Sequence, residues 1–463
     1  MTHTIGMISL GCAKNQVNAE HMLWLLRQAG YEISPDPDGA ELVIVNTCGF
    51  IESAKTEAID NILAMAQLKA EGRIQKILVT GCLAQRYQEE ILKELPEVDG
   101  VLGTGSYYDV ANAVGQVLSG KRYKRFDDIN ADQSEDGRIL TTPEYYAYLK
   151  IAEGCDNHCA YCVIPKLRGK LRSRPMEELV QEARGLARNG CKDLIKEAEQ
   201  LASDGVKELI VVAQDTSRYG LDLYGERKLA ELLRRLCKID GLVWVRVHYL
   251  YPDEMSQELI DVLANEPKIV KYLDIPIQHI NDEILRKMNR RGNGEYVRQL
   301  FTKLRHEIPG LVLRTSLITG LPGEGEVEFA QLCDFLKEYK LERVGAFAFS
   351  PEEGTRAAEM EYPDTEIAKQ RAEQVAEIQS RIMDDYNESC VGQVMQVLCE
   401  GYDPDEESYY GRTYADSPDI DGKIWFTAEK HIKTGDFVDV HVVDTYDGEL
   451  VGVLEEEYND DCE

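Results

Sequence analysis

The sequence has few basic residues for its acidic content. Its 463 residues include 52 lysines and arginines against 83 aspartates and glutamates, which gives a net charge of −31. This deficit counts against tight, sequence-independent binding to a phosphate backbone, because such binding requires exposed cations. The negative charge either serves solubility alone or favours a strongly basic partner.

Long apolar runs are also missing. No stretch approaches the roughly 18 consecutive apolar residues that a membrane-spanning helix needs. The first residues, "MTHTIGMISLGCAKNQ", have no basic flank, so we predict a buried strand there and no signal peptide. We therefore expect a cytoplasmic protein without a membrane partner. Disulfides are rare in that compartment, so the grouping of the 12 cysteines becomes informative.

The pattern of apolar residues predicts an α/β protein of several domains. Residues 1–120 alternate β-branched runs with amphipathic helices, which is typical of an open parallel sheet. The charged residues 121–140 are predicted to be a linker. Residues 141–373 contain six strand candidates separated by helical patterns, which predicts a partial (βα)6, TIM-like barrel. Short strands in 376–452 predict a small OB-like β-barrel, and 453–463 form an acidic tail.

One segment of the predicted barrel is duplicated. Residues 181–195, "QEARGLARNGCKDLI", and 196–210, "KEAEQLASDGVKELI", share eight identical positions. Fifteen residues are close to four turns of an α-helix, so one copy could lengthen a helix without rotating its faces. We interpret the repeat as a local duplication that extends or bulges out beside the barrel.

Three cysteines with the spacing C-x3-C-x2-C follow the first predicted barrel strand. Cys155, Cys159 and Cys162 occur in "GCDNHCAYC", and His158 between them is interpreted as a loop residue. A closed zinc site or a simple electron-transfer cluster uses four protein ligands. Three thiolates on a four-iron cluster leave one iron open, which can chelate an amine and a carboxylate. The alternatives are a zinc site completed from elsewhere and three core thiols.

Three further cysteines each follow a predicted strand of the N-terminal sheet. Cys12 comes after "ISLG", Cys48 after "VIVNT" and Cys82 after "LVTG". The carboxyl ends of neighbouring parallel strands converge on one crevice, so these residues can meet although they are far apart in sequence. This predicts a second three-cysteine cluster with an open iron, the alternative being three independent buried cysteines.

The cysteine loop, with Tyr161 directly before Cys162, resembles the radical S-adenosylmethionine superfamily, in which the cofactor supplies the missing ligand. The order of the parts resembles the methylthiotransferases over essentially the whole chain. Within that family the likeness is to the RimO type, which modifies protein S-twelve of the small ribosomal subunit. The sister type modifies a tRNA adenosine and usually has Asn where Asp215 stands. Two departures are Gly325, where Thr is common, and the duplication. The likeness rests on "SLGCAKNQVNAE", "IPKLRGKLRSR", "VVAQDTSRYGLDLYG", "HYLYP", "YLDIPIQH" and "FSPEEGT".

The resemblance implies two 4Fe–4S clusters, with Cys12, Cys48 and Cys82 as ligands of one and Cys155, Cys159 and Cys162 of the other. One S-adenosylmethionine would donate a methyl group to cluster-bound sulfur, and a second would supply a radical that attacks the β-carbon of an aspartate. The resemblance also implies weaker cofactor contacts. These are Tyr161 and the strand residues Ile318 and Gly320 near the adenine, and Arg174 and Arg314 with the methionine carboxylate. For each of them the alternative is a structural role or a surface ion pair.

The C-terminal module resembles the TRAM domain of the family. From Val391 onward it has 20 acidic and 4 basic residues, a net charge of −16. Such a surface should repel tRNA and attract a basic ribosomal protein, so we favour the protein substrate. A non-enzymatic iron–sulfur carrier is disfavoured because neither cysteine set has four members. The resemblance also implies a flavodoxin- or ferredoxin-type electron donor.

Overall fold

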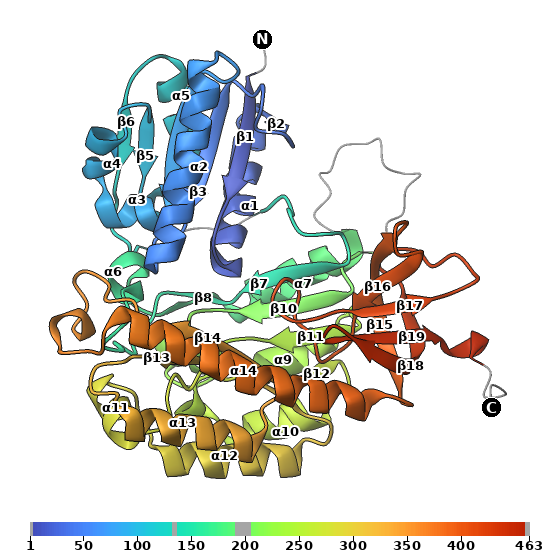
Figure 1. Ribbon diagram of the computed structural model, residues 1–463. Helices are drawn as coiled ribbons and strands as arrows, with labels where there is room; N and C mark the ends of the chain where they lie inside the picture. The colour runs from blue at the N-terminus through green and yellow to red at the C-terminus, as the bar shows by residue number, and fades with distance from the viewer. Residues whose placement is uncertain (1–2, 132–136, 190–204, 459–463) are drawn as a thin grey trace.

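The structure, a computed structural model, describes residues 3–131, 137–189 and 205–458. It has three parts: an N-terminal parallel sheet, a larger second sheet covered by helices, and a small closed β-barrel at the C-terminus (Figure 1). This arrangement confirms the α/β fold class. In the described residues no helix is both long and apolar enough to cross a membrane.

The first sheet has six parallel strands in the order β2-β1-β3-β4-β5-β6. The central strand β3 reads "LVIVNT" and is buried at every position, as expected for a parallel strand with both faces covered. Helices α1 and α5 cover one face, and α2, α3 and α4 the other. The strands are β1 (Thr4–Ser9), β2 (Glu32–Ser34), β3 (Leu42–Thr47), β4 (Lys76–Gly81), β5 (Gly100–Leu102) and β6 (Tyr123–Arg125). The helices are α1 (Ala13–Gln28), α2 (Glu52–Ala70), α3 (Cys82–Tyr87), α4 (Glu89–Glu94), η1 (Thr104–Asp109) and α5 (Val110–Leu118).

The segment 121–140 differs from the expected linker. Its residues Tyr123–Arg125 form the edge strand β6, which pairs with β5 in parallel. The strand is held by backbone hydrogen bonds and has a charged sequence, "YKR", so it carries no apolar signal. Further along, Arg138 is buried and its guanidinium binds Glu20 of α1. Both ends of the segment are therefore part of the fold.

The second sheet contains the six predicted barrel strands, all parallel, in the order β14-β13-β12-β11-β10-β7. It does not close on itself, so the barrel is open between β7 and β14. One large apolar core joins it to its outer helices. The strands are β7 (Tyr146–Lys150), β10 (Glu208–Val212), β11 (Trp244–Val247), β12 (Ile269–Asp274), β13 (Val312–Thr319) and β14 (Arg343–Ala348). The helices of more than one or two turns are α7 (Met176–Asn189), α9 (Leu229–Cys237), α10 (Gln257–Asn265), α12 (Gly294–Glu307), α13 (Glu326–Tyr339) and α14 (Thr365–Cys390).

Short elements connect these strands and helices. A two-stranded hairpin and a short helix frame the cysteine loop after β7, and the N-terminal part packs there, with α1 on β7 and α3 on α6 (Figure 1). Half of the duplicated stretch 181–210, residues 190–204, lies outside the described residues; the first copy begins in α7 and the second ends in β10. The short elements are β8 (Ala152–Glu153), α6 (Ile164–Arg168), β9 (Arg172–Ser173), η2 (Thr216–Arg218), α8 (Leu221–Tyr224), η3 (Pro252–Glu254), α11 (Asp282–Lys287) and η4 (Ala357–Glu359).

The residue Gly325 is the N-cap of α13. It has no hydroxyl to accept a hydrogen bond from the first turn, but its own N–H donates to Oε2 of Glu328 at 2.9 Å. The half of a capping box that Glu328 makes is therefore kept, and the hydroxyl of the common Thr would add the other half.

The C-terminal barrel is closed, with the strand order β15-β16-β17-β19-β18. It begins at Val394, later than the predicted 376, because α14 continues unbroken to Cys390 and packs along β14. Its last strand includes the first residues of the predicted acidic tail. The elements are β15 (Val394–Asp403), β16 (Ser408–Arg412), β17 (Ile424–Thr427), β18 (Phe437–Tyr446), β19 (Glu449–Leu454) and η5 (Glu455–Glu457).

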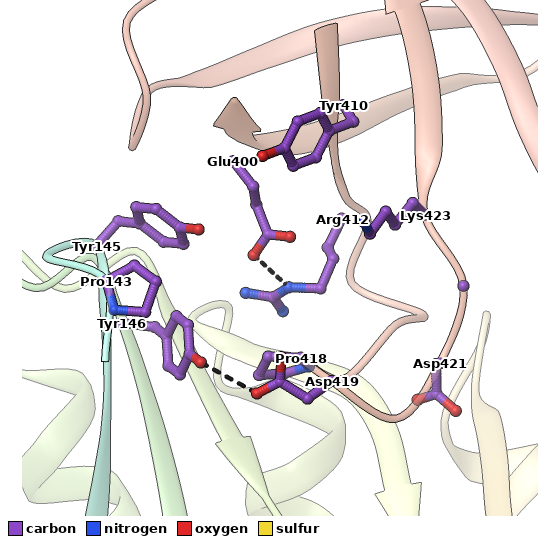
Figure 2. Close-up of a pocket in the computed structure, with 11 residues that line it drawn as sticks. Pro143, Tyr145, Tyr146, Glu400, Tyr410, Arg412, Pro418, Asp419, Asp421 and Lys423 are labelled. Atoms are coloured by element: carbon purple, nitrogen blue, oxygen red, sulfur yellow. Dashed lines mark hydrogen bonds and ion pairs between the residues drawn. The ribbon is translucent and has the colours of Figure 1, made fainter. Parts of the chain in front are cut away.

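The end of β16 fixes this barrel on the second sheet. Arg412 and Arg246 both bind the buried carboxylate of Glu208, each at 2.7 Å. A cavity of about 430 Å³ lies at this junction, between Tyr145 at the start of β7 and Glu400 of β15 (Figure 2). Because the cysteine loop follows the other end of β7, the cavity and the cysteines lie at opposite ends of that strand.

Candidate functional site

The three N-terminal cysteines lie at the carboxyl ends of β1, β3 and β4. Cys12 precedes α1, Cys48 follows β3 and Cys82 begins α3. Each lies close enough to the others for its charge to influence their pKa values. Gly11 has a φ of 88°, and a Cβ at this position would lie 3.0 Å from Sγ of Cys48. The crevice at the sheet edge thus brings together the three residues that the sequence singles out.

Cations from both domains surround this set. The guanidinium of Arg168 in α6 donates to Sγ of Cys82 from Nε at 3.3 Å and from Nη2 at 3.2 Å. Although desolvation in the crevice opposes the shift, the charges of Lys14 and Arg168 lower the pKa of Cys12 below its ordinary value. Burial raises the pKa of Cys48 to about 11. The site therefore holds one readily ionised thiol beside thiols that stay protonated until a metal displaces the proton.

A buried ionic network lies behind Arg168. Its Nη2 also donates to Asn15 at 2.9 Å, and Nη1 lies 3.4 Å from Glu153. The ammonium of Lys150 binds Glu153 at 3.0 Å, and Gln214 donates to the same carboxylate at 2.6 Å. Against the effect of burial, Lys150 and Arg168 hold the pKa of Glu153 far below its usual range. The Glu153 carboxylate is therefore ionised. Its negative charge balances Lys150 and Arg168, two cations of the barrel domain, next to the N-terminal cysteines.

The second cysteine set lies in the loop between β8 and α6. The loop is fixed by backbone hydrogen bonds, from Cys155 N to Gly169 O at 3.0 Å and from Cys162 N to Cys159 O at 3.0 Å. Gly154 has a φ of 79°, and a Cβ there would lie 2.0 Å from the carbonyl oxygen of Lys170. Burial raises the pKa of Cys155 to about 11.

Two residues near this loop were not identified from the sequence. The guanidinium of Arg290 lies 4.0 Å from Sγ of Cys159, 3.5 Å from the hydroxyl of Tyr161, and over the ring of Tyr251 at 4.1 Å. The Tyr251 hydroxyl is itself 3.9 Å from Sγ of Cys159. Tyr251 belongs to the "HYLYP" stretch, which offered a signal, whereas Arg290 comes from a charged loop that offered none.

The predicted cofactor contacts fall into two groups. Tyr161 and Ile318 pack on one apolar cluster beside the cysteine loop. Gly320 follows β13 with a φ of 74°, and a Cβ there would lie 2.3 Å from Cβ of Ala368, so it allows α14 to pack closely. Arg174 binds Glu182 at 2.7 Å, and Arg314 binds Asp274 at 2.9 Å. Both arginines thus have carboxylate partners within the protein.

The residue that distinguishes the two branches of the resembled family touches the cysteine loop. Asp215 accepts a hydrogen bond at 2.7 Å from Nδ2 of Asn157, which lies between Cys155 and Cys159. Burial raises the pKa of this carboxyl group. Position 215 therefore supports the loop directly, and an amide there would change the hydrogen bond that it makes.

The donor chemistry of both sets fits an iron–sulfur cluster. Among the described residues, no three histidine, cysteine, aspartate or glutamate side chains form a group that could hold a single metal ion. A cluster of several irons instead holds its ligands apart, and thiolates are the ligands that such clusters use. Each set offers three thiols, and a cation or a backbone N–H lies near the sulfur atoms.

Three family models match the chain in the order of its structural parts. The "Uncharacterized protein family UPF0004" matches residues 4–103, the radical SAM superfamily 149–336 and the TRAM domain 391–454. Among solved structures, the radical S-adenosylmethionine methyltransferase TsrM from Kitasatospora setae matches with a TM-score of 0.53 and 14% identity, over 77% of each chain. The enzyme OxsB matches with a TM-score of 0.50 and 13% identity, over 82% of this chain and 56% of its own. At such identities these two structures support the fold alone.

Curated relatives are much more similar. The "Ribosomal protein uS12 methylthiotransferase RimO" of Lachnoclostridium phytofermentans is 48% identical over 97% of this chain and 100% of its own. The protein of the same name from Acetivibrio thermocellus is 46% identical over 98% of both chains. That of Thermoanaerobacter sp. is 45% identical over 97% of this chain and 99% of its own. The chain therefore belongs to the RimO family of radical S-adenosylmethionine methylthiotransferases.

Proposed function

We propose that this enzyme adds a methylthio group to the β-carbon of an aspartate in ribosomal protein S-twelve. The observation that carries the proposal is the adjacency of two three-cysteine sets, each suited to a cluster with an open iron. Arg168 lies six residues after Cys162 and binds Cys82, so one short helix links the two sets. The name of the full-length relatives supports the substrate.

The proposed ligands are Cys12, Cys48 and Cys82 for one 4Fe–4S cluster and Cys155, Cys159 and Cys162 for the other. When bound, these clusters and two S-adenosylmethionines would supply sulfur, a methyl group and radical chemistry that no side chain can provide. The protein's own residues hold the site. Tyr161 and Ile318 offer an apolar wall beside the cysteine loop. Arg290 places a positive charge next to Cys159, where electron density accumulates on sulfur.

Several finer assignments belong to the same proposal. The acidic C-terminal module would attract the basic ribosomal protein or the small subunit, chiefly by raising the encounter rate. A cytoplasmic location follows from that substrate. A flavodoxin- or ferredoxin-type protein would supply electrons. Gly320 is proposed to shape the adenine region through the close packing of α14. For Arg174 and Arg314 a contact with the methionine carboxylate would require them to share or leave their present partners, Glu182 and Asp274.

The test offers both candidate substrates to one enzyme preparation. The protein is reconstituted anaerobically with iron and sulfide, then supplied with S-adenosylmethionine and a reductant. One reaction receives a basic peptide with the target aspartate, the other a tRNA anticodon stem–loop, and mass spectrometry detects an added methylthio group. Modification of the peptide alone is expected. Modification of the RNA alone would overturn the substrate assignment in favour of the sister branch.

A further inference from the structure

Lys14 is a buried cation between Cys12 and the second sheet. Its side chain lies in the first turn of α1, and the residue is only 7% exposed. Its ammonium lies over the ring of Tyr249, 3.4 Å from the ring centroid. Within residues 3–131, 137–189 and 205–458, no carboxylate lies within ion-pair distance of this ammonium. The charge of Asp274 acts on it, but Asp274 binds Arg314 at 2.9 Å.

The neighbouring buried cations are compensated differently. Arg168 and Lys150 both have Glu153 as a carboxylate partner. An ammonium taken out of water without an anion lowers stability. The first turn of a helix is also the positive end of its dipole, which disfavours a cation there and favours an anion. Among the described residues Lys14 has no carboxylate partner of this kind, although the charges of Tyr249 and Cys12 favour its ammonium; an incoming carboxylate would add an ion pair.

The residue that supports Lys14 has a strained backbone. Tyr249 has a φ of 60°, which is uncommon for a residue other than glycine. Its carbonyl oxygen accepts a hydrogen bond from Thr216 N at 3.1 Å, and its N–H donates to Asp274 at 3.3 Å. Such strain persists where surrounding structure enforces it, and it is concentrated at functional sites. Here it holds an aromatic face against the ammonium.

The crevice reaches the surface at Cys12, close to the buried Lys14. Cys12 is exposed and Cys82 is buried, so the N-terminal cysteine set is accessible at Cys12, two residues before Lys14. An anion that enters there meets the ammonium and the sulfur of Cys12 together. In an aspartate side chain the carboxylate is bonded directly to the β-carbon, so holding the carboxylate also positions the carbon that reacts.

We propose that Lys14 binds the side-chain carboxylate of the substrate aspartate and thereby selects it over a neutral group. This inference rests on the proposed function, because it assigns the recognition element for that substrate. The long-range field opposes such a choice: a protein of net charge −31 repels an additional negative charge on the substrate. A preference for aspartate over asparagine must therefore come from a local cation.

The test measures binding without turnover. Reconstituted protein, without reductant, is titrated with fluorescent basic peptides that carry either aspartate or asparagine at the target position. A hydrogen bond to a charged group contributes about 1.5–3 kcal/mol, so wild type should bind the aspartate peptide about 10- to 100-fold more tightly. The Lys14→Gln variant should lose this preference, and Lys14→Arg should keep part of it. An unchanged ratio of the two affinities in Lys14→Gln overturns the inference.

Controls distinguish a failure of the Lys14 proposal from a folding defect and from a failure of the proposed function. Lys93→Gln removes an exposed cation of the same domain and should leave the affinity ratio unchanged. Iron content, melting temperature and the partial rescue by Lys14→Arg show whether the Gln variant is folded and loaded. If wild type methylthiolates the peptide but Lys14→Gln keeps the preference, only the inference fails. If wild type modifies only RNA, the proposed function itself fails.

Discussion

At the scale of single residues, Arg168 is the side chain that joins the two cysteine sets. It follows Cys162 closely in sequence, yet its guanidinium binds Cys82, Asn15 and Glu153. A positive charge donating two hydrogen bonds to a thiolate stabilises the ligand form of that cysteine. Arg168 therefore contributes to the N-terminal set although it belongs to the barrel.

This role predicts a selective defect in the Arg168→Gln variant. Loss of charge-assisted bonds of about 1.5–3 kcal/mol should speed the loss of iron from the N-terminal set to a chelator about tenfold or more. Iron at the Cys155 set should be released at the wild-type rate. The measurement is chelator-dependent iron release, followed by absorbance and by electron paramagnetic resonance. Lys166→Gln, on the exposed side of the same helix, is the control, and equal acceleration at both sites would contradict the assignment.

Asp99 predicts a pH-dependent contribution to stability. Burial opposes its ionisation, but Lys69, Lys76 and the N–H of Ile77 outweigh it and lower the pKa of this carboxyl group. A folded-state pKa below the unfolded value stabilises the protein above the unfolded value, and this contribution disappears as the pH falls. Asp99→Asn should therefore reduce the free energy of unfolding by about 1–2 kcal/mol at pH 7.

The pH series tests that sign. Urea unfolding of the apoprotein is compared for wild type and Asp99→Asn between pH 7 and pH 3, and the difference should shrink towards zero at the acidic end. Asp60→Asn, an exposed change on α2, should show no such trend. A difference that is constant with pH would mean that the ionised form of Asp99 is not what stabilises the fold.

At the scale of helices and strands, the sequence predicts those elements that have a local periodic pattern of apolar residues. All six strands of the second sheet and the three strands that lead to Cys12, Cys48 and Cys82 are apolar runs between helical patterns. Strand β6 was missed because an edge strand of sequence "YKR" pairs only through its backbone. The contact between Lys14 and Tyr249 could not be predicted either. The two residues are 235 positions apart in the chain, and local sequence patterns do not show which distant residues meet in the fold.

The turns before and after α1 give a matched pair of glycine variants. Gly11 and Gly30 have φ values of 88° and 89°, so alanine at either position should cost about 1–2 kcal/mol of backbone strain. A Cβ at Gly11 would lie 2.7 Å from Cβ of Cys48, whereas nothing lies within 4 Å of a Cβ at Gly30. Gly11→Ala should therefore also displace Cys48. We expect it to retain about half of the iron, and Gly30→Ala all of it, by iron and sulfide analysis; equal contents would contradict this.

At the scale of the whole molecule, buried ion pairs join the three parts. Arg138 connects α1 to α7 through Glu20 and Glu182, and Glu208 connects the second sheet to the C-terminal barrel through Arg412. A third joint lies beside the cysteines. Such pairs add little net stability compared with apolar packing, but removing one member leaves a buried charge without a partner. Each joint thus fixes the relative position of two parts.

The third of these ion-pair joints predicts what holds the two cysteine sets in a fixed position relative to each other. Glu352, 3% exposed and in the "FSPEEGT" stretch, binds Arg86 at 2.7 Å and lies 3.2 Å from Lys55. Glu352→Gln removes the carboxylate that Arg86 binds and one of the two carboxylates next to Lys55, which keeps Glu52, at a cost of about 3 kcal/mol. Hydrogen exchange should increase in 49–55, 82–88 and 350–355 but not in the core strand β3. Glu353→Gln is the adjacent exposed control, and equal exchange in both variants would show that the joint does not hold the domains together.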